Sequence, residues 1–163
     1  MSLKISIIVP CFNGENYLEE CLNSIVSQDY ENIEILFVDN ESTDTSLKIA
    51  KKFKNKHFDK FKIGSAKNIF KYSWTEPVEE ALSRMRGDYF TIIAVDDAIS
   101  PDYISKVVKV LESLKGEVLC MQSPILRVQS GNKDMLTTWK PLQSSKEWKT
   151  ELLHHCPVNT PTM

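Results

Sequence analysis

The chain has 163 residues, of which 42% are hydrophobic and 26% charged, a composition typical of one soluble globular domain. Its formal net charge is -2, and lysines and glutamates are interspersed rather than gathered in blocks, so we predict no nucleic-acid partner. No apolar run approaches the ~18 residues that span a bilayer. Any association with a membrane is therefore expected to be peripheral.

The cysteines are scattered and show neither CxxC spacing nor the Cys/His spacing of a metal site. They are Cys11, Cys21, Cys120 and Cys156. The N-terminus also lacks the basic and apolar regions of a signal peptide. We therefore expect buried, reduced thiols in a cytoplasmic protein.

The first predicted unit is a strand, a turn and a helix. Residues 4–9 form an apolar, β-branched run that stops at Pro10, which lacks the amide donor needed to continue a strand. Asn13-Gly14 then marks a turn. Apolar residues at helical spacing predict an amphipathic helix from Glu15 to about Ser27.

The second unit repeats this order. A strand is predicted over residues 33–38, and residues 39–42 form a polar loop. We expect Ser42 or Thr43 to cap the helix that follows, with Asp44 favourably placed in its first turn. The residues expected to be buried on that helix are Leu47, Ala50 and Phe53.

The third unit starts from a basic stretch. Residues 51–62 are interpreted as a solvated helix end leading into a short strand, rather than as a nucleic-acid surface. Thr75 should cap the next helix, which should stop at Gly87. Its inner face is expected to carry Val78, Ala81, Leu82 and Met85. A buried strand is then predicted over residues 89–95, ending at Asp96-Asp97.

A further helix should start at Ser100-Pro101-Asp102 and end at Gly116. Its expected buried residues are Ile104, Val107, Val108, Leu111 and Leu114. The elements predicted after it are a strand over 117–122, a hairpin of strands 125–129 and 135–139 around 130–132, and a short helix over 145–154.

Strands that alternate with helices of this length indicate an α/β fold, with a mostly parallel sheet between helices on both faces in three α/β/α layers. Ligands bind such sheets beyond the carboxyl ends of the strands. Polar loops follow three of the predicted strands, at Pro10-Cys11-Phe12-Asn13, Asp39-Asn40 and Asp96-Asp97. We expect these loops to share one crevice.

The residue types in these loops suit two kinds of ligand. Adjacent carboxylates at Asp96-Asp97 resist simultaneous ionisation unless a cation or hydrogen-bond donors compensate, and oxygen ligands favour Mg²⁺ or Mn²⁺. A solvated loop or a helix cap is the alternative. Phe12 offers a flat apolar face and Asp39 an acceptor, which together suit a nucleobase. Packing over the first helix and a local turn are the alternatives for these two.

Several segments together resemble the family 2 glycosyltransferases of the GT-A fold. They are IIVPCFN at 7–13, Tyr17-Leu18, SIVSQ at 24–28, EILFVDNESTD at 34–44, and the stretch from Gly87-Asp88-Tyr89 through Asp96-Asp97 to Pro101-Asp102-Tyr103. The similarity spans about the first 120 residues in order. It implies a Rossmann-like nucleotide-sugar-binding domain over 1–122, and over 123–163 the start of an acceptor-side section that is cut short.

The resemblance also implies roles for individual residues. Nucleotide binding would fall to Pro10, Cys11, Phe12, Asn13, Asp39 and Asp96. Phe12 and Asp39 would hold the base, usually uracil. Asp97, together with Asp96, would bind the divalent cation, Mn²⁺ or Mg²⁺, which neutralises charge on the departing diphosphate.

The chain departs from the family pattern in two places. Ala94 stands where many relatives have an aspartate. Pro77-Val78-Glu79 replaces a stretch that carries a cation in relatives, and Lys67 and Lys71 are candidates to substitute for it.

The catalytic base is not assigned. Relatives place it in the acceptor-binding section, where it takes the proton of the acceptor hydroxyl. Only Asp134, Glu147 and Glu151 are candidates, by elimination. His154-His155 is interpreted as a surface loop rather than as a metal site.

Two functions are kept as hypotheses. The first is metal-dependent, inverting transfer of a sugar from a UDP-sugar to a saccharide or lipid-linked acceptor, in cell-envelope polysaccharide synthesis at the cytoplasmic face of the membrane. The alternative is a truncated, non-catalytic module that binds nucleotide-sugar. A phospho-receiver domain is disfavoured because its acidic pair follows the first strand, and a dinucleotide-binding fold because no GxGxxG is present.

Overall fold

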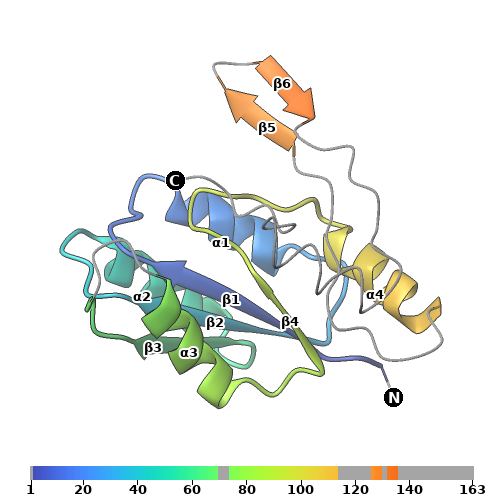
Figure 1. Cartoon of the computed structure of the whole chain (residues 1–163), viewed down its shortest axis with the longest axis horizontal. Helices are drawn as coiled ribbons and strands as arrows, with labels where there is room; N and C mark the ends of the chain where they lie inside the picture. Colours follow the sequence, from blue (N-terminus) through green and yellow to red (C-terminus); the bar gives the residue numbers. More distant parts are fainter. Residues whose placement is uncertain (1, 70–73, 114–125, 130–131, 136–163) are drawn as a thin grey trace, which may run out of the picture. The chain divides into compact units, whose positions relative to one another are not determined.

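The computed structural model of the chain describes residues 2–69, 74–113, 126–129 and 132–135 (Figure 1). The described residues up to Ser113 belong to one compact unit, and those from 126 onward belong to a second. The boundary predicted after residue 122 lies outside the described residues, and so do the strand predicted over 117–122 and the helix predicted over 145–154.

A four-stranded, wholly parallel sheet forms the centre of the first unit, in the order β3-β2-β1-β4. The strands are β1 (Ile5–Cys11), β2 (Ile33–Asp39), β3 (Phe61–Ser65) and β4 (Tyr89–Ile92). Every residue of β1 and β2 is buried, as their near-continuous apolar sequences favour for the middle of a parallel sheet. The predicted α/β fold with a mostly parallel sheet is confirmed.

Helices cover both faces of this sheet (Figure 1). They are α1 (Leu18–Val26), α2 (Ser46–Lys56), α3 (Thr75–Arg84) and α4 (Tyr103–Ser113). Ala81 of α3 packs against Leu36 and Val38 of β2. Phe37 points to the opposite face, where its ring stacks on Phe61, which in turn contacts Phe53 of α2. Among the described residues, no helix is long and apolar enough to cross a membrane.

Pro10 does not end β1, contrary to the prediction. The strand continues to Cys11, which pairs with Asp39 at the end of β2. The missing amide of Pro10 does no harm on this side, because alternate residues of a strand face alternate neighbours and Pro10 does not face β2.

The effect of Pro10 falls instead on β4, which ends at Ile92 and not at Val95 as predicted. The Ile8 carbonyl accepts a hydrogen bond of 2.9 Å from the Ile93 amide, so Ile8 faces β4. Pro10, two residues further on, faces the same side and has no amide to donate. The ladder between β1 and β4 therefore stops at the pair Ile8–Ile92, and the chain after it leaves the sheet.

Three helices do not begin at the residues predicted. α1 begins at Leu18 rather than Glu15, and α4 begins at Tyr103. α3 begins at Thr75, which was expected to be its cap, and Trp74 holds the cap position without a capping side-chain bond.

The inner faces of the helices are narrower than the apolar periodicity indicated. Leu82 of α3 is 37% exposed, contrary to the prediction, and Pro77 is buried with Ala81 instead. Leu47 and Val107 are only half-buried. Leu114 and Gly116 lie outside the described residues.

In the second unit, β5 (Leu126–Gln129) and β6 (Asn132–Met135) pair antiparallel. The predicted antiparallel pairing is present, but its second strand is Asn132–Met135 and shares only Met135 with the predicted strand 135–139.

A buried carboxylate ties the sheet to the segment between α3 and β4. Glu34 of β2 is 2% exposed and accepts hydrogen bonds from Ser6 Oγ at 2.7 Å, from Lys62 Nζ at 2.6 Å and from the Arg86 amide. The Gly87 amide donates to Ser6 Oγ at 3.0 Å. A buried charge is tolerated here because a cation and two further donors satisfy it.

Glu34 should make stability depend on pH in the acid range. Burial alone would raise the pKa of Glu34, but the hydrogen bonds from Lys62, Ser6 and Arg86 outweigh it and lower the pKa from 4.5 to about 2. The ionised carboxylate therefore stabilises the fold fully above about pH 4.5, and this contribution is lost as pH falls toward 2. Glu34→Gln should lower the free energy of unfolding in urea at neutral pH by about 2–4 kcal/mol, and by less as pH falls below 4.5.

Glu80→Gln is the matched control, because Glu80 pairs with Arg84 on the surface of α3. It should change the free energy of unfolding by less than about 1 kcal/mol. An effect of Glu34→Gln that equals that of Glu80→Gln, or that does not vary with pH, would contradict a stabilising role of the ionised Glu34 carboxylate.

Candidate nucleotide-binding site

One cavity of about 680 Å³ lies at the carboxyl ends of β1 and β2, beside the chain that follows β4. The three loops singled out in the sequence all contribute to it. It is lined by Pro10, Cys11, Phe12, Asn13, Gly14, Tyr17, Asn40, Trp74, Pro77, Ala94, Val95 and Asp96.

The structure brings most of the predicted site residues together. Five of them line the cavity, namely Pro10, Cys11, Phe12, Asn13 and Asp96. Asp39 and Asp97 do not line it themselves, but each adjoins a residue that does. Asp39 is only 7% exposed and precedes Asn40, and half-buried Asp97 follows Asp96.

Gly14 lies in the loop after β1. It allows this loop to touch the loop after β4, which carries Asp96-Asp97 and is called the acidic loop. A Cβ at this position would lie 2.8 Å from Val95 Cγ2 and 3.3 Å from Cys11 Sγ, which is too close for any other residue without movement of the chain. The preceding residue, Asn13, has a positive φ of 52°, which asparagine tolerates better than most residues. The turn seen in the sequence thus also closes the cavity.

Hydrogen bonds join the loop after β1 to the loop after β2. The Asn13 amide donates to Ser42 Oγ at 3.0 Å, and Asn13 Oδ1 accepts from the Thr43 amide at 2.8 Å. The Gly14 amide donates to Ser46 Oγ at 2.9 Å. These bonds fix the two loops against each other without a ligand.

The start of α2 is capped differently from the prediction. Ser42 and Thr43 bond to Asn13 and are not available as caps. The Ser46 amide instead donates to Asp44 Oδ1 at 2.9 Å. Burial raises the pKa of Asp44, but hydrogen bonds, first among them those from Ser46, outweigh it, and the net pKa is lowered.

Glu15 completes this arrangement from the first loop. Its Oε2 accepts hydrogen bonds from the Thr45 amide at 3.0 Å and from Thr45 Oγ1 at 2.7 Å, while its own amide donates to Asp44 Oδ2 at 3.0 Å. An acidic residue outside α2 therefore satisfies an amide at the helix start and suits the positive end of the helix dipole.

The two carboxylate oxygens of Asp39 differ in their hydrogen bonding. Its Oδ2 accepts a bond of 3.3 Å from the Ser42 amide. Its Oδ1 is buried and has no hydrogen-bond partner among the residues that the structure describes. A buried acceptor without a donor is unfavourable by about 1–3 kcal/mol, so a ligand that donates a hydrogen bond here gains affinity.

The acidic pair shows the electrostatic conflict expected from its sequence. Burial raises the pKa of Asp97, and the charge of Asp96 raises it further. A divalent cation would relieve this conflict, so the two carboxylates fit a metal. Within the described ranges, no three His, Cys, Asp or Glu side chains gather to hold an ion, so further ligands would come from phosphate oxygens and water.

Two aromatic residues of the cavity were not anticipated. Tyr17 is 55% exposed at the start of α1, and Trp74 precedes α3. The only sequence signal for Trp74 was its position directly before Thr75, the predicted cap of a helix. Lys67 is exposed and does not line the cavity, and Lys71 lies outside the described residues.

Cys11 and Cys21 are buried free thiols, as predicted, whereas Cys120 and Cys156 lie outside the described residues.

Together these features define an α/β protein whose cavity at the carboxyl ends of a parallel sheet combines an aromatic loop with a carboxylate pair. The chain belongs to glycosyl transferase family 2, because the model of that family matches residues 6–163.

Relatives and solved structures agree with this family. The chain is 34% identical over 122 residues to Glycosyltransferase GlyA of Streptococcus pneumoniae serotype 4. This match covers 71% of this chain and 16% of GlyA. It is 35% identical over 117 residues to dolichyl N-acetyl-alpha-D-glucosaminyl phosphate 3-beta-D-2,3-diacetamido-2,3-dideoxy-beta-D-glucuronosyltransferase of Methanococcus voltae. This match covers 69% of this chain and 35% of that protein.

S. aureus TarS 1-349 in complex with UDP-GlcNAc matches with a TM-score of 0.59 at 29% identity, over 68% of this chain and 32% of TarS 1-349. The chain thus spans between 16% and 35% of the length of these three proteins.

Glu15→Ala should destabilise the fold, because the start of α2 loses the acceptor of two hydrogen bonds from Thr45. We expect a loss of about 1–2 kcal/mol in the free energy of unfolding, measured in urea. Glu31→Ala is the control, since Glu31 is also an exposed loop glutamate. Equal effects of the two substitutions would show that the hydrogen bonds from Thr45 to Glu15 do not contribute to stability.

Proposed function

We propose that this chain binds the nucleoside diphosphate of a nucleotide-sugar, and that it serves a glycosyltransferase reaction. The observation that carries the proposal is that the loops after β1, β2 and β4 converge on the same cavity. It offers an aromatic face at Phe12 and a carboxylate at Asp96, which suit the two chemically different ends of such a ligand.

At one end of the cavity, Phe12 and Asp39 would bind the base. Phe12 would stack on its face, and Asp39 Oδ1, which has no partner among the described residues, would accept a hydrogen bond from a ring N–H. Uracil carries such an N–H between its two carbonyl groups, whereas cytosine has an acceptor there. This contact disfavours a cytidine nucleotide, and the complex of TarS 1-349 with UDP-GlcNAc supports, by analogy, a uridine nucleotide as the proposed donor.

At the other end, Asp97 and Asp96 would hold a divalent cation, Mn²⁺ or Mg²⁺, that is shared with the diphosphate. When bound, the cation supplies Lewis-acid stabilisation of the departing nucleoside diphosphate. The chain's own residues position the donor and keep the two carboxylates side by side. No lysine or arginine lines the described part of the cavity, so the cation would carry the positive charge that the diphosphate needs.

The proposed reaction is transfer of the sugar to an acceptor hydroxyl with inversion. Its catalytic base remains unassigned: Asp134 lies on β6 of the second unit, and Glu147, Glu151 and His154-His155 lie outside the described residues. A saccharide or lipid-linked acceptor, a role in cell-envelope synthesis, and a cytoplasmic location at the inner face of the membrane remain predictions from the sequence.

The second candidate is a module that binds the donor without transferring its sugar. One observation favours it, because all of the described residues that line the cavity belong to the first unit. Calorimetry with UDP and Mn²⁺, combined with an assay for hydrolysis of a UDP-sugar, separates the two functions. Binding with turnover supports the transferase, binding without turnover supports the module, and failure to bind UDP would contradict both.

Asp39→Asn should remove discrimination between bases. The wild-type chain should bind UDP at least about 10-fold more tightly than CDP, because only uracil donates to Asp39 Oδ1. An asparagine amide can donate to cytosine as well as accept from uracil, so the preference should disappear. Asp59→Asn, which changes an exposed loop aspartate, should keep it. Equal affinity of the wild type for UDP and CDP in calorimetry would refute the base contact.

Asp97→Asn should separate metal binding from stability. The raised pKa of Asp97 means that the fold disfavours its charged form, so a neutral side chain should leave the melting temperature without metal unchanged or higher. The increase in UDP affinity on adding Mn²⁺ should fall about 10-fold or more in Asp97→Asn and in Asp96→Asn. Asp59→Asn should retain the full increase. A wild-type Mn²⁺ effect that survives both substitutions would exclude this pair as the metal site.

A further inference from the structure

The loop that carries Asp96-Asp97 is attached to α1 at both of its ends. At its start, Cys21 Sγ donates to the Ala94 carbonyl at 3.4 Å. At its end, the Ile99 amide donates to Ser24 Oγ at 3.2 Å. Cys21 and Ser24 lie three residues apart on α1 and so share one face of the helix.

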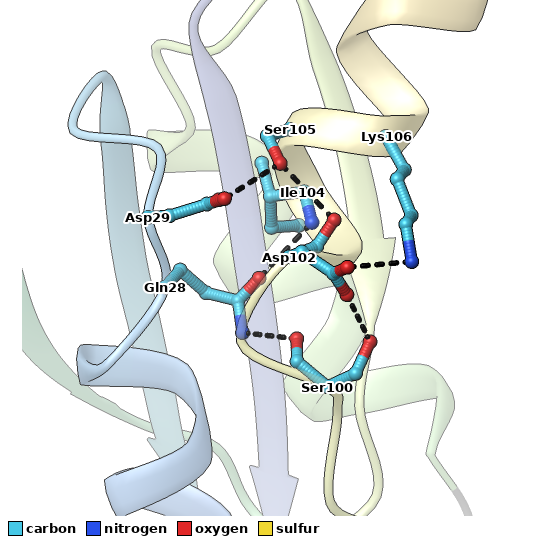
Figure 2. A network of polar contacts seen from close by, with 7 residues as sticks. All are labelled: Gln28, Asp29, Ser100, Asp102, Ile104, Ser105 and Lys106. Carbon is cyan, nitrogen blue, oxygen red and sulfur yellow. Dashed lines mark hydrogen bonds and ion pairs between the residues drawn. The ribbon is translucent and has the colours of Figure 1, made fainter.

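Gln28, just beyond the end of α1, makes the last of these attachments (Figure 2). Its Nε2 donates to the Ser100 carbonyl at 2.8 Å and to the Ser24 carbonyl at 3.0 Å. Its Oε1 accepts from the Ile104 amide at 3.0 Å, in the first turn of α4. One side-chain amide therefore joins the end of α1, the end of the acidic loop and the start of α4.

One further contact in Figure 2 touches the acidic loop, because Ser100 Oγ donates to Asp102 Oδ1 at 2.9 Å. The others involve α4 alone: Ser105 Oγ donates to Asp29 Oδ2 at 3.0 Å, and Lys106 pairs with Asp102, which directly precedes α4. Ser105 therefore belongs to the same network as Gln28 without touching residues 94–100. It provides a matched comparison for the effect of Gln28 on the loop.

We propose that Gln28 and Ser24 are positioning residues for the carboxylates of Asp96 and Asp97. This inference rests on the proposed function. The two carboxylates are adjacent in the sequence and carry like charges, and their repulsion favours loop conformations in which they separate. Bonds at both ends of the loop limit that separation, so the pair is held ready for a cation that is shared with a diphosphate. The proposed base and metal contacts give no role to the segment SIVSQ at 24–28. Its Ser24 and Gln28 have one here, in positioning the acidic loop.

The test is calorimetry of the 163-residue chain with UDP, in the presence and absence of Mn²⁺. Gln28→Met keeps the length of the side chain and removes its hydrogen bonds. It should leave UDP affinity without metal within about twofold of wild type and reduce the Mn²⁺-dependent increase about 10-fold or more. Ser105→Ala should change neither quantity.

Ser24 provides an independent test. Ser24→Ala removes the acceptor of the Ile99 amide and should weaken the Mn²⁺ effect, whereas Ser24→Thr keeps a hydroxyl and should restore it. If Gln28→Met does not fold, this pair decides: a retained Mn²⁺ effect in Ser24→Ala overturns the proposal.

The outcomes also distinguish the two levels of inference. A wild-type chain whose UDP binding does not respond to Mn²⁺ contradicts the proposed function. If the wild type responds, and Gln28→Met responds equally or loses metal-free affinity to the same extent, the proposed function stands and the positioning role is refuted.

Discussion

The parallel register of β1 between β2 and β4 is the constraint on which the whole site depends. β1 stays paired with β2 up to Cys11, so the loops that follow these two strands leave the sheet at the same level. Pairing with β4 stops earlier, because Pro10 has no amide to offer on that side. The chain after β4 is therefore free to leave the sheet, and it passes against Gly14, where only a glycine leaves room for Val95. A single imino acid in the central strand thus sets where the third wall of the cavity begins.

The two ends of the cavity are held in different ways. At the end where we propose that the base binds, Asn13 and Glu15 exchange hydrogen bonds with the loop after β2. Such an end would bind a rigid group without first having to be ordered, which would preserve affinity. At the acidic end, burial and like charge oppose the ionisation of Asp97, and contacts from α1 keep the loop in place against that repulsion. The fold therefore supplies order at one end and stored electrostatic repulsion at the other.

The sequence predicted the sheet, the helices on both faces and the three converging loops, because these follow from apolar periodicity and from the direction of parallel strands. The errors occur where contacts distant in sequence decide between local alternatives. Ser42 is a good helix cap by residue type, but the Asn13 amide, 29 residues away, takes its hydroxyl. Val95 continues an apolar run, yet the strand has already ended because of a proline in its neighbour. Trp74 enters the cavity only through the placement of α3, which periodicity cannot fix.

The charge balance of the cavity has a thermodynamic consequence for the proposed function. Its described lining holds a carboxylate at Asp96 and neither lysine nor arginine, so a diphosphate brings further negative charge to a site where Asp97 already resists ionisation. Two carboxylates are also too few ligands to hold Mg²⁺ or Mn²⁺ firmly by themselves. The diphosphate therefore lacks positive charge, which the cation would supply, and the cation lacks oxygen ligands, which the diphosphate would supply. If the cation strengthens diphosphate binding, the diphosphate must strengthen cation binding by the same factor. Under the proposed function, reciprocal coupling of this kind would let the same two carboxylates bind a donor together with its cation and bind either one alone only weakly.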